Sequence, residues 1–170
     1  MINKFTPGTL FKMRKLLYSP EQIEQGFALC KSQNGISSGE ICYGSECEID
    51  VRKSKCNSES EAIGAFHTHP ARTKQEPSIN DLLLPALGSG IECIGFKGIK
   101  KIKCYSSKEK EFTKINMLRL ATQLSESSHK IENMVSNRKI SRSESIRMQN
   151  DENNRIKFKA LSLFNVEDIL

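Results

Sequence analysis

Two histidines at the end of an apolar stretch give this chain its strongest constraint. Ala62-Ile63-Gly64-Ala65-Phe66 has the composition of a buried strand, and His67-Thr68-His69-Pro70 follows it directly. Pro70 has no N–H to give to a sheet ladder, so we expect the strand to end there. A polar loop follows over residues 71–77, and then an apolar, helix-like run over residues 79–87. This order predicts a strand, a loop and a helix, with both imidazoles at the end of the strand.

The same pattern supplies three side chains that could bind one metal ion. Residues i and i+2 of a strand project from one face, so His67 and His69 could reach the same ion. Asp81 falls in the first turn of the expected helix, where its carboxylate could return to the two imidazoles. Two histidines and one carboxylate leave a fourth tetrahedral position for water, which is the ligand set of a catalytic zinc site. The alternatives are two hydrogen-bonded histidines and, for Ser78 with Asp81, an ordinary helix cap.

These residues also carry a resemblance to a known family. His67-Thr68-His69-Pro70, seven further residues, and then Ser78-Ile79-Asn80-Asp81-Leu82 is similar to the motif of the JAMM (MPN+) zinc metalloproteases, especially their prokaryotic members. The resemblance spans roughly residues 20–113, and its loop is one residue longer than the commonest form, which costs little in closure entropy. It implies a JAB1/MPN, cytidine-deaminase-like fold with one zinc ion per chain. It also implies hydrolysis of isopeptide or peptide bonds after a ubiquitin-like modifier protein.

The family also implies a glutamate as general base and a serine as oxyanion donor. Ser78 occupies the serine position. Glu24 precedes an apolar strand-like segment at about the separation from His67 that the family shows, and Glu40 is the rival because it too lies on a strand-like segment. Both glutamates could equally be solvated surface carboxylates. The alternatives for the whole protein are a non-catalytic scaffold of this fold and a hydrolase acting on a different peptide substrate.

The remaining pattern predicts an α/β fold: a mixed, curved sheet flanked by helices, with a C-terminal helical extension. Residues 1–113 form the expected metalloprotease domain. Helices are expected over residues 11–18 and 20–25. Strands are expected over residues 26–31, 39–43, 47–51, 62–67, 91–96, 100–105 and 111–114, with a hairpin turn at Gln33-Asn34-Gly35.

The C-terminal third changes in character. Apolar residues at helical spacing predict an amphipathic helix over residues 114–135 that packs on the domain. Residues 136–154 are polar, which indicates a flexible linker or an exposed helix. Apolar residues return over 155–170, where alternation through residues 156–160 suits an added strand. This tail could dock on its own domain or bind a partner.

Composition bears on the compartment and on partners. The six cysteines are spread without any Cys-x-x-Cys pair, so we expect buried thiols rather than a second zinc site. Cys42 and Cys47 could face each other across a hairpin, although intracellular proteins rarely keep disulfides. No apolar run reaches the length of a membrane span, so an intracellular, cytoplasmic protein is expected. The net charge is +6, but without tryptophan or an aromatic-interleaved basic motif, nucleic-acid binding is not expected.

Overall fold

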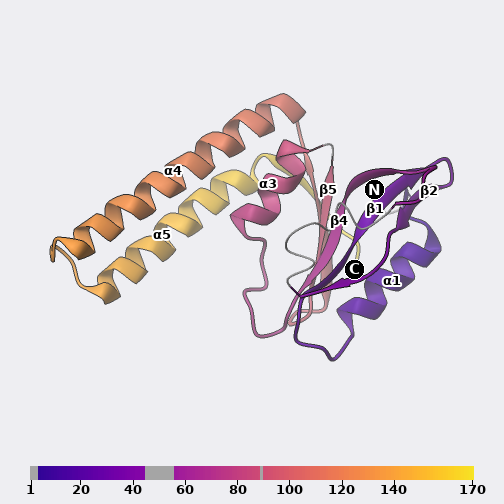
Figure 1. Cartoon of the computed structure of the whole chain (residues 1–170), viewed down its shortest axis with the longest axis horizontal. Helices are drawn as coiled ribbons and strands as arrows, with labels where there is room; N and C mark the ends of the chain where they lie inside the picture. The colour runs from indigo at the N-terminus through magenta and orange to yellow at the C-terminus, as the bar shows by residue number, and fades with distance from the viewer. Residues whose placement is uncertain (1–3, 45–55, 89) are drawn as a thin grey trace.

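The computed structural model describes residues 4–44, 56–88 and 90–170, and it shows a mixed α/β fold (Figure 1). Within these ranges seven strands form one open sheet in the order β2-β1-β4-β5-β6-β7, with β3 also paired to β1. The strands are β1 Gln25–Ser32, β2 Gly35–Ser38, β3 Cys42–Tyr43, β4 Glu61–His69, β5 Ile91–Phe96, β6 Lys101–Ser107 and β7 Phe164–Asp168. The helices are α1 Pro7–Leu17, α3 Ile79–Leu87, α4 Lys110–Ser136 and α5 Arg142–Leu161. The expected mixed sheet with flanking helices is therefore confirmed.

The two faces of the sheet carry different cores because side chains alternate along each strand. Phe66 on β4 and Cys93 on β5 point toward α1 and belong to the core under that helix. Ile94 and Phe96 on β5 point the other way and pack with Leu82 of α3. The second core also includes residues from the first turns of α4 and the last turns of α5. Helices thus cover both faces of the central strands.

The centre of the sheet is the strand, loop and helix unit that the sequence predicts. Strands β4 and β5 are parallel and are connected through α3, whereas the other pairs of described strands are antiparallel. A parallel pair needs such a crossover, and a helix usually supplies it. The C-terminal end of β4 therefore faces the N-terminal end of α3, where ligand sites of α/β sheets commonly lie.

Helices α4 and α5 form an antiparallel pair that extends away from the sheet (Figure 1). Helix α4 begins at Lys110, so the strand expected over residues 111–114 is wrong. Helix α5 occupies most of the polar segment 136–154, which is an exposed helix rather than a linker. The strand predicted from the alternation of apolar and polar residues over 156–160 is wrong, because these residues lie in the last turns of α5. The strand that follows is β7. That strand pairs with β6, so the tail docks on its own domain.

Near the N-terminus the expected elements shift. The helix expected over residues 20–25 is absent: residues 20–24 form an irregular segment, and residue 25 is the first of β1. Of the strand expected over 39–43, only residues 42 and 43 form a strand, the short β3. The hairpin partner of β1 is β2, which follows a two-residue turn at Gln33 and Asn34. Gly35, with φ of 113°, accommodates the end of that turn. The strand expected over 47–51 lies outside the described residues.

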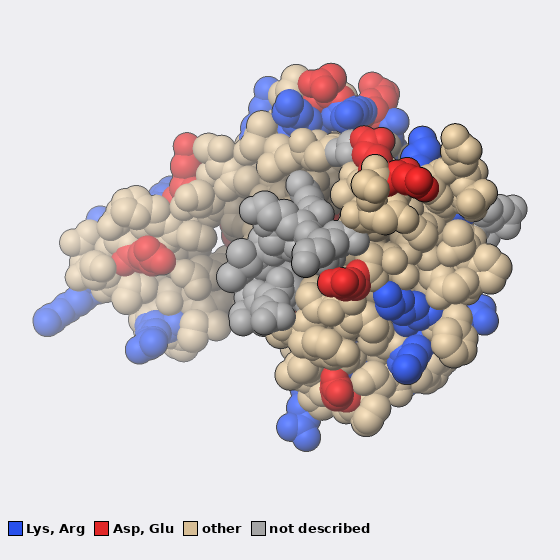
Figure 2. Space-filling view, turned by 45° about the vertical axis from the view of Figure 1, so that its right-hand side comes forward, with Lys and Arg blue, Asp and Glu red and all other residues tan. Residues whose placement is uncertain are grey.

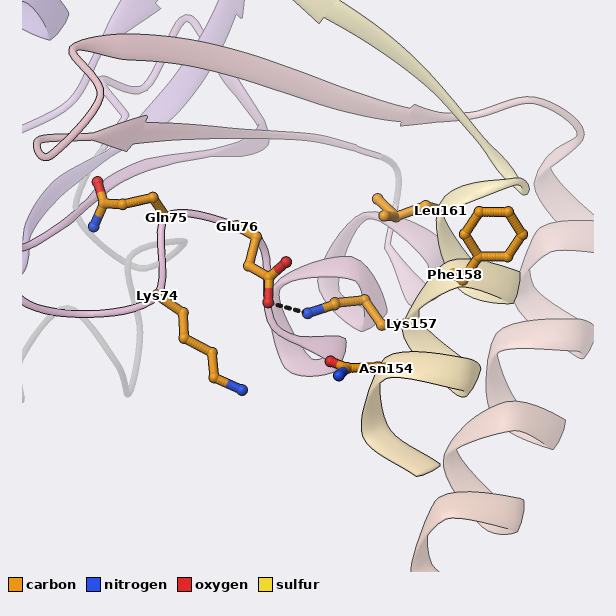
Figure 3. A pocket seen from close by; sticks show the side chains of 7 residues that line it. All are labelled: Lys74, Gln75, Glu76, Asn154, Lys157, Phe158 and Leu161. Atoms are coloured by element: carbon orange, nitrogen blue, oxygen red, sulfur yellow. Dashed lines mark hydrogen bonds and ion pairs between the residues drawn. The ribbon is translucent and has the colours of Figure 1, made fainter. Parts of the chain in front are cut away.

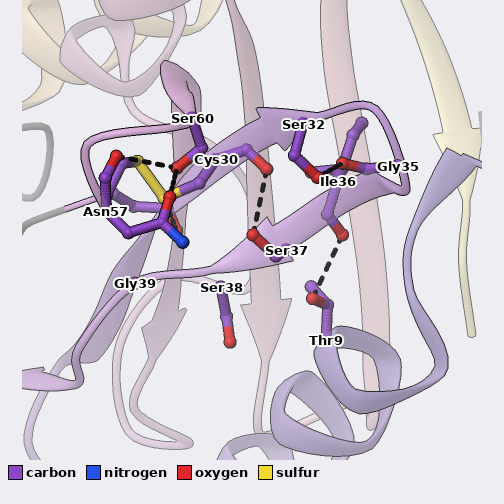
Figure 4. The surroundings of a disulfide bond; sticks show 12 residues. Thr9, Cys30, Ser32, Gly35, Ile36, Ser37, Ser38, Gly39, Asn57 and Ser60 are labelled. Carbon is purple, nitrogen blue, oxygen red and sulfur yellow. Dashed lines mark hydrogen bonds between the residues drawn. A yellow bond between two sulfur atoms is a disulfide. The ribbon is translucent and has the colours of Figure 1, made fainter.

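The cysteines correct the prediction of free thiols. Cys30 on β1 is bonded to Cys56, just before β4 (Figure 4). Cys93 is bonded to Cys104 directly across β5 and β6. Cys42 is also disulfide-bonded, and Cys47 lies outside the described residues. Spacing along the chain did not reveal these pairs because each joins neighbouring parts of the folded sheet.

Acidic and basic side chains are interspersed over the face shown in Figure 2. On that face the described residues form no large patch that is only acidic or only basic. Among the described helices, none combines the length and the apolar character needed to cross a lipid bilayer.

Candidate metal centre

Strand β4 presents the two histidines on the face covered by α3. His67 pairs with Ile94 and His69 with Phe96 in the parallel register, so all four side chains share that face. His69 packs edge-on against the ring of Phe96. On the other side of β4, Gly26 lies opposite His67, and a Cβ at residue 26 would lie 2.5 Å from the carbonyl oxygen of Phe66. Glycine therefore permits the close approach of β1 to the histidine strand.

The loop after β4 and the cap of α3 bring Asp81 to the histidines. Gln75 holds the loop by donating to the Pro70 carbonyl at 2.8 Å and accepting from the Gly98 N–H at 2.6 Å. Ser78 is the N-cap of α3: its Oγ accepts from the Asp81 N–H at 3.1 Å, and its own N–H donates to Asp81 Oδ2 at 2.6 Å. The helix cap that was the alternative interpretation of Ser78 and Asp81 is thus present as a capping box, and it fixes the orientation of the Asp81 carboxylate beside the two histidines.

Among the described residues, His67, His69 and Asp81 form a group whose metal-ligating atoms all lie within 4.8 Å of one another. The two Nε2 atoms are 3.1 Å apart, and each is 3.4 Å from one oxygen of Asp81. A tetrahedral zinc ion with bonds of about 2.0–2.1 Å holds its ligand atoms about 3.3–3.4 Å apart. Each imidazole meets a different oxygen of Asp81, Oδ1 for His67 and Oδ2 for His69, so the carboxylate spans both Nε2 atoms and the three side chains converge closely enough to bind one ion.

The outer nitrogens of both rings determine where their lone pairs point. His67 Nδ1 lies 2.8 Å from Glu92 Oε1, and His69 Nδ1 lies 3.2 Å from the Lys74 carbonyl oxygen. A carboxylate and a carbonyl can only accept, so both Nδ1 atoms donate. In the neutral rings both Nε2 lone pairs then face the Asp81 carboxylate at close range. Such a set repels itself unless a cation or an extra proton lies among the three groups, and this fits a metal ion.

Without a metal, the proton is held by His67. Burial alone would lower the pKa of His67, but hydrogen bonds with Asp81 and Glu92 and the charges of both carboxylates outweigh it and raise the pKa to about 10. Burial would likewise raise the pKa of Asp81, but hydrogen bonds from His67 and His69 hold it well below its usual range. Asp81 is therefore ionised at neutral pH, as a metal ligand must be.

The two candidate bases differ in their surroundings. Glu24 is half-buried and lies directly before β1, two residues from Gly26, which pairs with His67. Its carbonyl accepts from the Gly44 N–H at 2.8 Å. Glu40 is exposed and interacts with Lys12 of α1, whose helix covers the face of the sheet opposite the histidines. Neither glutamate is part of the close group of ligands, and Glu24 is the one nearer in register to His67.

Sequence reasoning missed two buried ionisable residues beside this group. Glu92, the partner of His67, has a side chain only 3% exposed. Lys97, whose burial lowers its pKa, donates from Nζ to the Glu21 carbonyl at 2.6 Å and to Gln25 Oε1 at 3.0 Å. Lys97 therefore ties the segment that carries Glu24 to the end of β5. The sequence did contain a signal for both residues: Glu92 is a charged residue within the apolar run of β5, and Lys97 follows that run directly.

An open groove of about 650 Å³ borders the same loop (Figure 3). Lys74, Gln75 and Glu76 of the loop form one side, and residues of α5 form the other. An ion pair between Glu76 and Lys157 joins the two sides. The groove combines a polar rim with the exposed ring of Phe158.

Comparison with known proteins adds no family assignment. A scan against protein-family models finds no match to this chain, and a search of curated proteins finds no significant match. The chemistry of the site must therefore be argued from the motif and the geometry of these residues.

Proposed function

We propose that this protein is a zinc-dependent metallopeptidase of the JAMM type, with a JAB1/MPN-like fold. The observation that carries the proposal is the arrangement of His67, His69 and Asp81. Their ligating atoms lie within 4.8 Å of one another, and the hydrogen bonds that both Nδ1 atoms donate leave both Nε2 atoms free to bind an ion beside Asp81. With three protein ligands, a fourth tetrahedral position is free for water or substrate.

The residues around the ligands have distinct roles in this proposal. His67, His69 and Asp81 would hold the zinc ion, which would supply an activated water molecule and polarise the scissile carbonyl. Glu24 accepts the proton of the attacking water and delivers it to the departing amine. Ser78 donates a hydrogen bond from its hydroxyl to the developing oxyanion, because its contact with the Asp81 N–H uses the hydroxyl only as an acceptor. The mechanism needs no covalent intermediate.

The substrate follows from the resemblance of the motif rather than from a bound molecule. We propose an isopeptide or peptide bond after a ubiquitin-like modifier protein. The two alternatives, a non-catalytic scaffold and a hydrolase of another peptide, keep the same ligands but predict different results in a cleavage assay.

The test is cleavage of a linear fusion between a ubiquitin-like protein and a reporter, with zinc-loaded and chelator-treated enzyme. We expect cleavage with zinc and none after chelation. Glu24→Gln should keep its zinc and lose turnover, and Glu40→Gln is the matched control that should keep both.

Loss of turnover in Glu40→Gln instead would contradict the assignment of the base. Stoichiometric zinc without cleavage of any peptide in a substrate panel would favour the scaffold. Failure of the wild type to bind zinc would refute the proposal as a whole.

A further inference from the structure

Glu92 is a buried carboxylate that the proposed mechanism does not use. It lies on β5, the central strand next to β4, and faces the same side of the sheet as His67. Its side chain is 3% exposed, and its Oε1 lies 2.8 Å from His67 Nδ1. Burying a carboxylate is costly unless a charge or a strong hydrogen bond compensates for it. The position of Glu92 therefore needs a reason beyond packing.

The contact with His67 provides that reason. Glu92 Oε1 lies on Nδ1 of the ring, while Nε2 of the same ring lies 3.4 Å from Asp81 Oδ1. His67 is thus held between a carboxylate on its outer nitrogen and the group of proposed ligands on its inner nitrogen.

The hydrogen bond has a second consequence for His67. Because Glu92 accepts from Nδ1, it fixes the tautomer that leaves the Nε2 lone pair free, and it fixes the rotation of the ring. A carboxylate on the outer nitrogen of a ligating histidine also makes the ligand more basic.

We infer that Glu92 is a positioning residue that sets the zinc affinity of the cluster through His67. The inference rests on the metal centre proposed above, but it concerns a residue that touches neither the metal nor the substrate.

The test measures zinc affinity directly, by competition with a chromogenic chelator, for the wild type, Glu92→Gln and Glu92→Ala. Loss of such a partner typically weakens metal binding by about 10–100-fold, and we expect this for Glu92→Ala. Glu92→Gln keeps an oxygen that accepts from Nδ1 but lacks the charge, so its affinity should fall between the other two. Glu61→Gln, an exposed carboxylate at the start of β4, is the matched control and should bind like the wild type.

Urea unfolding of the metal-free variants separates positioning from general damage. Glu92→Gln is nearly isosteric and should stay folded, so its affinity can be read even if Glu92→Ala unfolds. Absorption of the cobalt-substituted proteins gives a second readout, because a displaced His67 changes the tetrahedral d–d bands. Wild-type affinity in both Glu92 variants would overturn the inference and leave the proposed function standing. Absence of zinc binding in the wild type would overturn both.

Discussion

The metal-free protein should lose stability as the pH rises from 6.5 to 8.5. Hydrogen bonds and charges from Asp81 and Glu92 raise the pKa of folded His67 from 6.5 to about 10. A group with a raised pKa stabilises the fold fully below its unfolded pKa, and this stability is lost as the pH rises through the folded pKa. Between these values the unfolded chain releases a proton that the folded protein keeps.

The magnitude follows from the two pKa values. The difference between the unfolded and folded pKa of His67 corresponds to about 5 kcal/mol of stability below pH 6.5. About 2 kcal/mol of this stability is lost between pH 6.5 and 8.5. Asp81, whose pKa is held low, stays ionised throughout this range and adds no slope. Lys97 has a lowered pKa, so its own contribution rises with pH and opposes that of His67. A comparison with a variant that lacks only the His67 titration removes this background.

The assay is urea unfolding at 25 °C in the presence of a chelator, for the wild type and His67→Gln. The free energy of unfolding of the wild type should fall by about 2 kcal/mol relative to the variant over this range. With saturating zinc this loss should disappear, because zinc binding displaces the His67 proton, and above pH 6.5 the folded and unfolded states then bind nearly the same number of protons at this residue. Parallel pH profiles of the two metal-free proteins would refute the reasoning about the cluster.

Three further predictions concern the scaffold of the site. Gly26→Ala places a Cβ 2.5 Å from the Phe66 carbonyl oxygen. The free energy of unfolding in urea should therefore fall by about 1–3 kcal/mol, and zinc binding should weaken. Unchanged stability would mean that β1 moves aside freely. Replacing Cys30 and Cys56 together by alanine removes a disulfide with a sequence separation of 26. The free energy of unfolding in urea should fall by about 3.5 kcal/mol. An unchanged urea midpoint would contradict this. Ser78→Ala should lower stability by about 1 kcal/mol through the lost cap. It should also lower kcat by about 10²–10³-fold, and normal turnover would exclude Ser78 as the oxyanion donor.

The central unit of the fold could be predicted because its local signals agree. An apolar run, a terminating proline, and a serine three residues before an aspartate each indicate the same strand, loop and helix. The predicted strand over 91–96 coincides with β5, because apolar residues fill it almost completely. The same spacing correctly brought His67, His69 and Asp81 together.

The parts that failed depend on contacts between distant segments. Alternation suggested strands over 111–114 and 156–160, but both stretches belong to helices that pack against each other. Helix α5 lacks a wide apolar stripe, although the capping box of Ser141 and Glu144 marked its start. The disulfides and the contact between Glu92 and His67 join residues on neighbouring strands, and the register that creates them cannot be read from spacing alone.

The most direct test of the metal centre is zinc X-ray absorption spectroscopy of the protein loaded with one zinc ion per chain. We expect two imidazole nitrogens and oxygen ligands at about 2.0–2.1 Å, with Asp81→Ala losing one oxygen and most of the affinity. A spectrum dominated by sulfur at about 2.3 Å, or zinc that washes out of the wild type as readily as from Asp81→Ala, would contradict the account.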